Sequence, residues 1–189
     1  MGIILASGSP RRRELLEMLG LDFEVCPARG GEHPPEHAGP EETVLALARA
    51  KAAEVAEHSG AENVIIAADT IVWLDGAVLG KPHGEAEAAD MLRRLSGREH
   101  EVWTGLCIMR GGKELDGAER TYVKFRELAQ DEISAYIATG EPMDKAGAYG
   151  AQGRASVFVE GIRGDFFNVM GLPLCRLGKM LGKLGVKLL

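Results

Sequence analysis

The sequence predicts a mixed α/β fold, in which a twisted sheet is flanked by helices and bent into two lobes. Two observations favour this fold. Apolar strand-like runs alternate with helical patterns in the first half of the chain, and strands joined by tight glycine turns dominate the second half. No linker rich in proline or serine divides the 189 residues, so we expect one domain that spans residues 1–189.

The elements of the first half follow from apolar runs and from helix boundary signals. Ser9 and Pro10 are typical of a helix start, because serine caps helices and proline fits the first helical position. Glycine follows each of the two helical patterns and is expected to end it. The elements expected here are a strand at 2–7, a helix from Pro10 to Gly20, a strand at 22–27, a helix at 41–59 and a central strand at 64–69.

The elements of the second half are predicted from alternating patterns and glycine turns. Thr121, Val123 and Phe125 alternate with polar residues, as in a half-buried strand. The elements expected here are a hairpin around Asp75-Gly76, a helix at 85–96, long strands within 99–128 joined at Gly111-Gly112, a helix at 131–138, a glycine-rich loop at 139–153, a hairpin at 155–169 and a helix at 172–184.

Charge and cysteine content limit the partners and the compartment. The chain has 22 basic and 28 acidic residues, so its net charge of −6 gives no overall attraction to nucleic acid or to an anionic membrane. Its three cysteines form no C-x-x-C pair, which suits a reducing compartment. The N-terminal charges follow the apolar run, the reverse of a signal peptide. We therefore expect a cytoplasmic protein without a membrane partner.

Three consecutive arginines, Arg11 to Arg13, fall in the first turn of the first expected helix. Cations are disfavoured there by about a few tenths of a kcal/mol each, because the helix dipole is positive at that end. One interpretation is a phosphate site, formed by guanidinium groups and the preceding serine-rich turn. The alternative is a solvated basic face paired with Glu14 and Glu17, which suits Arg13 better than Arg11 or Arg12.

Other charged residues are candidates for the same chemistry. Asp69 follows the apolar run of the central strand, where α/β sheets place ligands, although an aspartate there is also a common turn cap. Lys51 lies on an apolar helical stripe and either extends to its rim or points into a cleft. Lys81 lies between Gly80 and Pro82, where a surface turn is the alternative.

Three glycines mark the segment from Gly147 to Gly153, at the end of the long glycine-rich loop. Its backbone can approach a ligand closely, and Gln152 offers a paired donor and acceptor that could recognise the imide edge of uracil or thymine. A purely structural Ω-loop is the alternative. Histidines near Glu32 lack the spacing of metal ligands, so solvated side chains are favoured there.

Taken together, five stretches resemble the Maf family of nucleoside triphosphate pyrophosphatases from residue 2 to about residue 181. They are LASGSPRR (5–12), AADTIV (67–72), GKP (80–82), EPMDKAGAYGAQG (141–153) and NVMGLPL (168–174). The resemblance implies a single Maf-like domain, with a fold similar to that of the inosine triphosphate pyrophosphatases and a cleft between two lobes. It also implies a divalent cation, Mg²⁺ or Mn²⁺, and a homodimer.

The resemblance further implies an activity and a set of site residues. The family cleaves nucleoside triphosphates between the α and β phosphates. By position, Asp69, Lys81 and Lys51 are the implied catalytic residues, and Asp69 and Glu32 the implied metal ligands. Substrate contacts are implied for Ser7, Arg11, Arg12, Thr70 and Gln152.

Three of these residue types, at Arg11, Thr70 and Gln152, agree with the subgroup that acts on dTTP and UTP, and modified nucleotides are further candidate substrates. The chain departs from the family pattern at Gly31-Glu32, where an Asp-Glu pair is usual. The alternative function is a non-catalytic regulator of septum formation that binds protein or nucleic acid.

Overall fold

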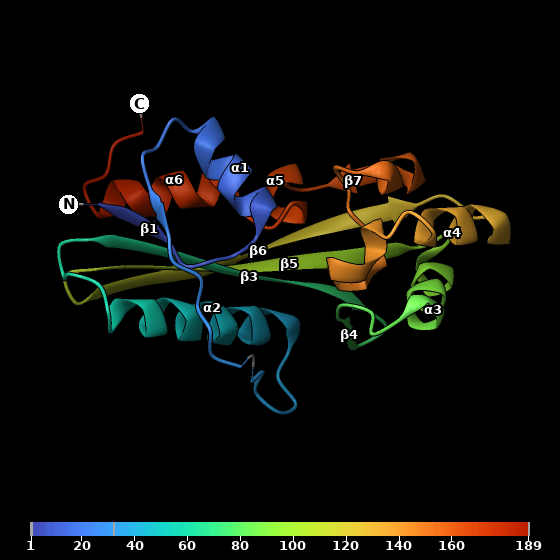
Figure 1. Cartoon of the computed structure of the whole chain (residues 1–189), viewed down its shortest axis with the longest axis horizontal. Helices are drawn as coiled ribbons and strands as arrows, with labels where there is room; N and C mark the ends of the chain where they lie inside the picture. The colour runs from blue at the N-terminus through green and yellow to red at the C-terminus, as the bar shows by residue number, and fades with distance from the viewer. Residues whose placement is uncertain (1, 32, 189) are drawn as a thin grey trace. The chain divides into compact units, whose positions relative to one another are not determined.

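Seven strands in the described part of the chain form one mixed sheet (Figure 1). The computed structural model describes residues 2–31 and 33–188. The strand order is β2-β1-β3-β5-β6-β7, with β4 paired to β3. The strands are β1 (Ile3–Leu5), β2 (Glu24–Val25), β3 (Val64–Leu74), β4 (Ala77–Leu79), β5 (Glu99–Arg110), β6 (Lys113–Phe125) and β7 (Val159–Arg163). β1 runs parallel to β2 and β3, whereas β4 and β7 pair antiparallel with β3 and β6.

Helices follow the boundary signals of the sequence closely. Pro10 begins the first helix directly after Ser9, and Pro40 begins the second after Gly39. The helices are α1 (Pro10–Met18), α2 (Pro40–Ala56), α3 (Glu85–Leu95), α4 (Gln130–Ile137), α5 (Phe166–Val169) and α6 (Leu174–Lys183). Three short 3₁₀ helices, η1 (Glu141–Asp144), η2 (Ala146–Ala148) and η3 (Arg154–Phe158), interrupt the later loops.

The chain divides into two compact units. The first unit contains the residues up to Asp69, Thr104–Glu119 and the residues from Gly171 onward; the second contains Thr70–Trp103 and Arg120–Met170. Strands β3, β5 and β6 each contribute residues to both units. The expected cleft between two lobes, and the expected single domain, stay predictions.

In the first unit, α2 covers one face of the sheet, and α1 and α6 cover the other (Figure 1). The residues between α2 and the sheet are mostly small, which allows a close approach of the helix backbone. A Cβ atom at Gly105 on β5 would lie 2.3 Å from the carbonyl oxygen of Val44 on α2. The buried cluster here contains Ile4, Ala6, Ala48, Ala52, Val55, Ile65, Ala67 and Cys107.

The second unit has a core rich in aromatic rings. The ring of Phe125 on β6 packs edge-on against those of His100, Tyr149 and Phe158, with centroids 5.1, 4.8 and 6.1 Å away. Helices α3 and α4 pack against each other and supply further buried side chains such as Leu92. Ala148 and Tyr149 of the glycine-rich loop are themselves part of this core.

The structure confirms the mixed α/β class and corrects two local expectations. Residues 155–169 form no hairpin: η3 leads into the single strand β7, which pairs with β6, and α5 follows because the Asp165 side chain accepts a hydrogen bond from Phe167 N. Asp69 lies within β3 and not at its carboxyl end, because the strand continues to Leu74 to pair with β4. In the described residues, no helix is both long and apolar enough to span a membrane.

Candidate active site

Ser7 and Arg12 form the first pair of predicted site residues that the structure brings together. The Arg12 guanidinium donates from Nη1 to Ser7 Oγ at 3.1 Å and from Nε to the carbonyl oxygen of Gly171 at 2.8 Å. Ser7 Oγ also accepts from Ser9 N at 3.3 Å. These bonds hold the side chain of Arg12 in one orientation at the start of α1, where a cation and backbone N–H groups favour an anion.

Lys51 and Asp69 form the second pair, in the same unit. Lys51 Nζ lies 2.5 Å from Asp69 Oδ1, and the side chains are 19% and 8% exposed. Lys51 stands on the stripe of α2 whose Val44, Ala48 and Val55 are buried, as its helical spacing predicts. Because both groups are largely shielded from water, removal of either partner would leave the other charge without compensation.

Register places both pairs near the same end of β1. Leu5 pairs with Ile66, and Ala6 N donates to Ile66 O at 2.8 Å, after which β1 ends and the turn with Ser7 begins. Asp69 stands three residues beyond Ile66 on β3. The carboxylate of Asp69 therefore lies just past the point where the parallel neighbour leaves the sheet, although not at the end of its own strand.

The remaining described candidates belong to the second unit, apart from Arg11. Lys81 and Gln152 are both exposed, and Thr70 is partly buried on β3. Gly147 N donates to Gly80 O at 3.0 Å, so the turn that carries Lys81 is bonded to the start of the loop that carries Gln152. This contact joins two segments that the sequence places about seventy residues apart.

Three other predictions have distinct outcomes. Arg13 forms an ion pair with Glu17 at 2.8 Å, and its side chain is 62% exposed, which confirms the solvated interpretation for this arginine. Arg11 is partly exposed in the same helical turn. Glu32 lies outside the described residues. Within residues 2–31 and 33–188, no group of three or more His, Cys, Asp or Glu side chains is arranged to hold a metal ion.

Several structurally important side chains carry no signal that the sequence could reveal. Glu54 on α2 accepts hydrogen bonds from the backbone N–H groups of Arg29 and Gly30, at 2.6 and 2.9 Å, which lowers its pKa. His100 is 2% exposed, and burial lowers its pKa to about 4. Glu141 accepts hydrogen bonds from the Tyr136 hydroxyl on α4 and from Arg154 N, directly after the glycine-rich loop. Each contact joins residues that are distant or irregularly spaced in the sequence.

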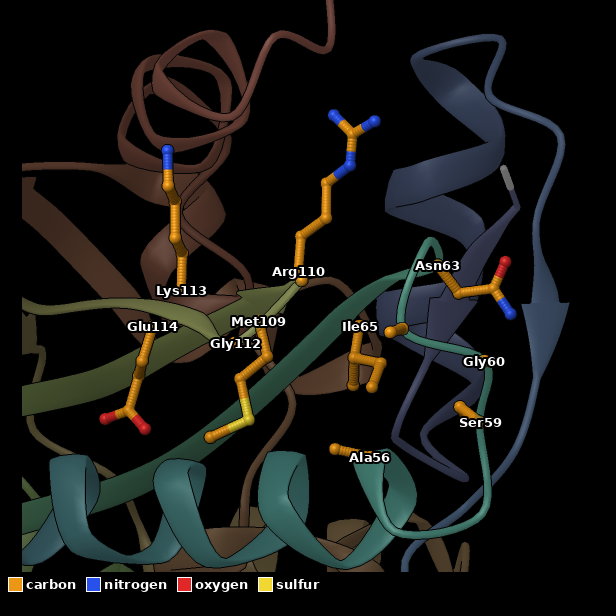
Figure 2. Close-up of a pocket in the computed structure, with 12 residues that line it drawn as sticks. Ala56, Ser59, Gly60, Asn63, Ile65, Met109, Arg110, Gly112, Lys113 and Glu114 are labelled. Carbon is orange, nitrogen blue, oxygen red and sulfur yellow. The ribbon is translucent and has the colours of Figure 1, made fainter.

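A cavity of about 250 Å³ lies elsewhere in the first unit, between the end of α2 and the β5–β6 turn (Figure 2). Figure 2 shows Met109 directed towards α2, and Arg110 and Lys113 directed to the opposite side of the sheet. None of the predicted site residues that the structure describes lines it. Arg110 Nη1 already donates to Leu184 O at 2.5 Å, and Asn63 Oδ1 accepts from Gly2 N.

The fold and these side chains define a class of protein: a mixed α/β protein whose cationic and carboxylate groups suit phosphate chemistry. The chain belongs to the Maf family, since the family model described as "Maf-like protein" matches residues 2–184.

Named relatives cover nearly the whole chain. A dTTP/UTP pyrophosphatase of Bacillus cereus is 48% identical over 184 residues, which are 97% of this chain and 96% of the relative. A dTTP/UTP pyrophosphatase of Thermococcus gammatolerans is 55% identical over 172 residues, 91% of each chain. Among solved structures, a nucleoside-triphosphatase (dITP/XTP pyrophosphatase) of Mycobacterium abscessus matches with a TM-score of 0.46 and 16% identity over 97% of each chain.

Proposed function

We propose that this protein hydrolyses dTTP and UTP to the nucleoside monophosphate and pyrophosphate. Relatives that are 48% and 55% identical over more than nine-tenths of the chain carry the name dTTP/UTP pyrophosphatase. The structural observation that carries the proposal is the presence of two ordered pairs, Ser7–Arg12 and Lys51–Asp69, in one unit. They supply the cations and the carboxylate that hydrolysis of a polyphosphate needs.

The cationic residues would neutralise the triphosphate. Arg12 is already held by Ser7 and Gly171, so little side-chain freedom is lost when its guanidinium meets a phosphate oxygen. Lys51, Lys81 and Arg11 are the further cations proposed for this role. Such groups accelerate the reaction only where negative charge increases, on the leaving pyrophosphate and around the phosphorus.

The chemical step is attack of a water oxygen on the α phosphorus. The new bond joins that oxygen to phosphorus, the bond from phosphorus to the α–β bridging oxygen breaks, and pyrophosphate leaves with the bonding electrons. The water proton needs an acceptor, and Asp69 is the proposed base, with Glu32 as the second candidate. Lys51 orients the Asp69 carboxylate, because its ammonium lies 2.5 Å from Oδ1.

Asp69 and Glu32 are the proposed protein ligands of Mg²⁺ or Mn²⁺. The donor chemistry fits, because Mg²⁺ is commonly held by one or two carboxylates, with substrate phosphates and water completing its shell. A site of this kind needs no cluster of three protein ligands, and none is found among the described residues. When bound, the ion would neutralise phosphate charge and favour ionisation of a nearby water.

Base selectivity is proposed to depend on Gln152, Thr70 and Arg11. The carboxamide of Gln152 can donate one hydrogen bond and accept another, which matches the imide edge that uracil and thymine share. Cytosine presents the reverse pattern of donor and acceptor at these positions, so Gln152 discriminates against it only while its carboxamide is held in one orientation. Gln152 is exposed, as a residue that must reach a ligand would be.

Asp69→Asn tests the catalytic assignment. We expect a loss of at least about a hundredfold in kcat, the range attributed to acid–base catalysis. Asp22→Asn, which changes an exposed aspartate of the same unit, is the matched control and should retain full activity. If Asp69→Asn has a native circular dichroism spectrum and activity within a few-fold of the wild type, the role assigned to Asp69 is wrong.

The regulator alternative predicts no turnover. A panel of normal and modified nucleoside triphosphates, assayed for pyrophosphate with and without Mg²⁺, distinguishes the two. The names of the relatives favour the enzyme. The homodimer and the cytoplasmic location stay predictions.

A further inference from the structure

Gln152 stands in a tight turn that is bonded at both ends. Gly153 N donates to Gly150 O at 2.9 Å, which closes the turn Gly150–Gly153 with Ala151 and Gln152 at its centre. Gln152 itself is exposed, and the hydrogen bonds described at this turn are made by the backbone of its neighbours. The position of its carboxamide therefore depends on whatever fixes the two flanks.

Glu141 contacts both flanks of this turn. Its Oε2 accepts a hydrogen bond from Arg154 N at 3.0 Å, directly after the turn. Its Oε1 accepts from the Tyr136 hydroxyl at 3.0 Å, and that hydroxyl in turn accepts from Gly150 N at 3.3 Å, at the beginning of the turn. One carboxylate thus holds the amide after the turn directly and the amide before it through a buried phenol.

The turn also packs tightly onto this carboxylate. A Cβ atom at Gly153 would lie 2.1 Å from Glu141 Oε1 and 2.6 Å from its carboxyl carbon. At Gly150 a Cβ atom would lie 2.7 Å from Cε of Lys145, whose ammonium donates to Glu141 O at 2.8 Å. Both glycines therefore let the backbone touch the side chains beneath it, which restricts how far the turn can shift.

The start of the loop is held separately. The Tyr149 hydroxyl is 2.8 Å from His100 Nε2, inside the aromatic core, and Gly147 N donates to Gly80 O. These contacts anchor residues 147–149. The amides of Gly150 and Arg154 are bonded instead to Tyr136 and Glu141, and Gly153 O accepts from Ser156 N at 3.0 Å. The two sets of contacts can therefore be changed independently.

We propose that Glu141, acting through the Tyr136 hydroxyl and the Arg154 amide, is the positioning residue that orients Gln152 for base recognition. The proposal rests on the function proposed above for Gln152. Glu141 touches neither substrate nor reacting atoms in this role. Its effect is on the ratio between correct and incorrect bases and not on the hydrolytic step.

Glu141→Gln is a sensitive perturbation, because a carboxylate accepts at both oxygens whereas a carboxamide accepts at one. If the amide oxygen faces Arg154 N, the amide NH₂ faces the Tyr136 hydroxyl, whose proton then loses its acceptor. The opposite orientation places two donors together at Arg154. Either arrangement loses one hydrogen bond without changing the size of the side chain. Tyr136→Phe removes the hydroxyl that connects Glu141 to Gly150 N.

The experiment measures kcat/KM for dTTP and dCTP in the wild type, Glu141→Gln, Tyr136→Phe, Gln152→Ala and the double variant Glu141→Gln/Gln152→Ala. We expect Glu141→Gln and Tyr136→Phe each to lower the dTTP/dCTP ratio by about five-fold, the effect of one hydrogen bond. In the Gln152→Ala background, Glu141→Gln should leave the ratio unchanged, because its effect acts through Gln152. Glu160→Gln, an exposed change on β7, is the control.

The outcomes separate this inference from the proposed function. An equal loss of kcat/KM for both nucleotides in Glu141→Gln, or a lowered ratio that persists without Gln152, overturns the positioning role. Wild-type selectivity in Gln152→Ala overturns the assignment of Gln152 itself. The rate of hydrogen exchange at the Gly150 and Arg154 amides is a measurement that does not depend on activity. Faster exchange in folded Tyr136→Phe than in the wild type supports the connection from Glu141 through Tyr136 to the turn. Unchanged exchange at both amides contradicts it.

Discussion

Acidification should destabilise this protein through one buried histidine. His100 on β5 is 2% exposed, and its Nε2 lies 2.8 Å from the Tyr149 hydroxyl in the core of the second unit. Burial lowers the pKa of His100 from 6.5 to about 4, because the charged imidazolium would lose its hydration. The folded protein therefore holds this ring neutral over a pH range in which the unfolded chain protonates it.

The sign and size of the effect follow from proton linkage. Between pH 6.5 and pH 4 the unfolded state binds the additional proton, so the free energy of unfolding falls as the pH is lowered through this window. The slope approaches about 1.4 kcal/mol per pH unit for one proton. Over the whole displacement of the pKa the loss reaches roughly 3 kcal/mol, a large part of a typical domain stability.

Urea unfolding of the wild type and of His100→Gln, followed by circular dichroism from pH 7 to pH 4.5, measures this directly. Glutamine can still hydrogen-bond to Tyr149 but does not titrate. The free energy of unfolding of His100→Gln should therefore fall less steeply with decreasing pH than that of the wild type, and the difference in slope corresponds to at most one proton. His83→Gln, an exposed histidine of the same unit, should behave as the wild type. Parallel pH profiles for the wild type and His100→Gln would refute the reasoning.

Three further changes have defined outcomes. Gly105→Ala should destabilise by about 1–3 kcal/mol in urea unfolding, because its Cβ would meet the α2 backbone, whereas Gly182→Ala, with open space, should not. Arg12→Lys should raise KM for dTTP about five-fold, since one ammonium cannot replace both guanidinium bonds. Lys51→Met should lower the unfolding temperature strongly, at a cost of about 3 kcal/mol, by leaving the Asp69 carboxylate buried and unpaired.

Local patterns predicted the surroundings of two candidate residues, because such patterns record which side of an element faces the core. The stripe that places Lys51 among buried residues of α2 follows from helical spacing, and the burial of Asp69 follows from the apolar run before it. Periodicity could not show that β3 continues past Asp69, because that depends on pairing with β4. It likewise could not separate β7 and α5 from a hairpin, since the capping side chain of Asp165 decides the boundary.

Contacts between distant segments lay beyond prediction. Nothing in the sequence around Glu141 indicates that its carboxylate accepts from Arg154 N, thirteen residues later, or that Tyr136 links it to Gly150. Similarly, His100 stands between two glutamates in a polar stretch, yet its ring is buried because alternate side chains of β5 face the core. Such positions become visible only when the tertiary packing is known.

Product analysis of hydrolysis by the purified full chain tests the central claim most directly. With Mg²⁺ or Mn²⁺ present, dTTP and UTP should yield dTMP or UMP and one pyrophosphate per turnover, and dCTP should be cleaved far more slowly. The wild type should lose this activity in the presence of a chelator and regain it when the cation is restored. Nucleoside diphosphate and inorganic phosphate as products, or no metal-dependent turnover of dTTP and UTP, would contradict the claim.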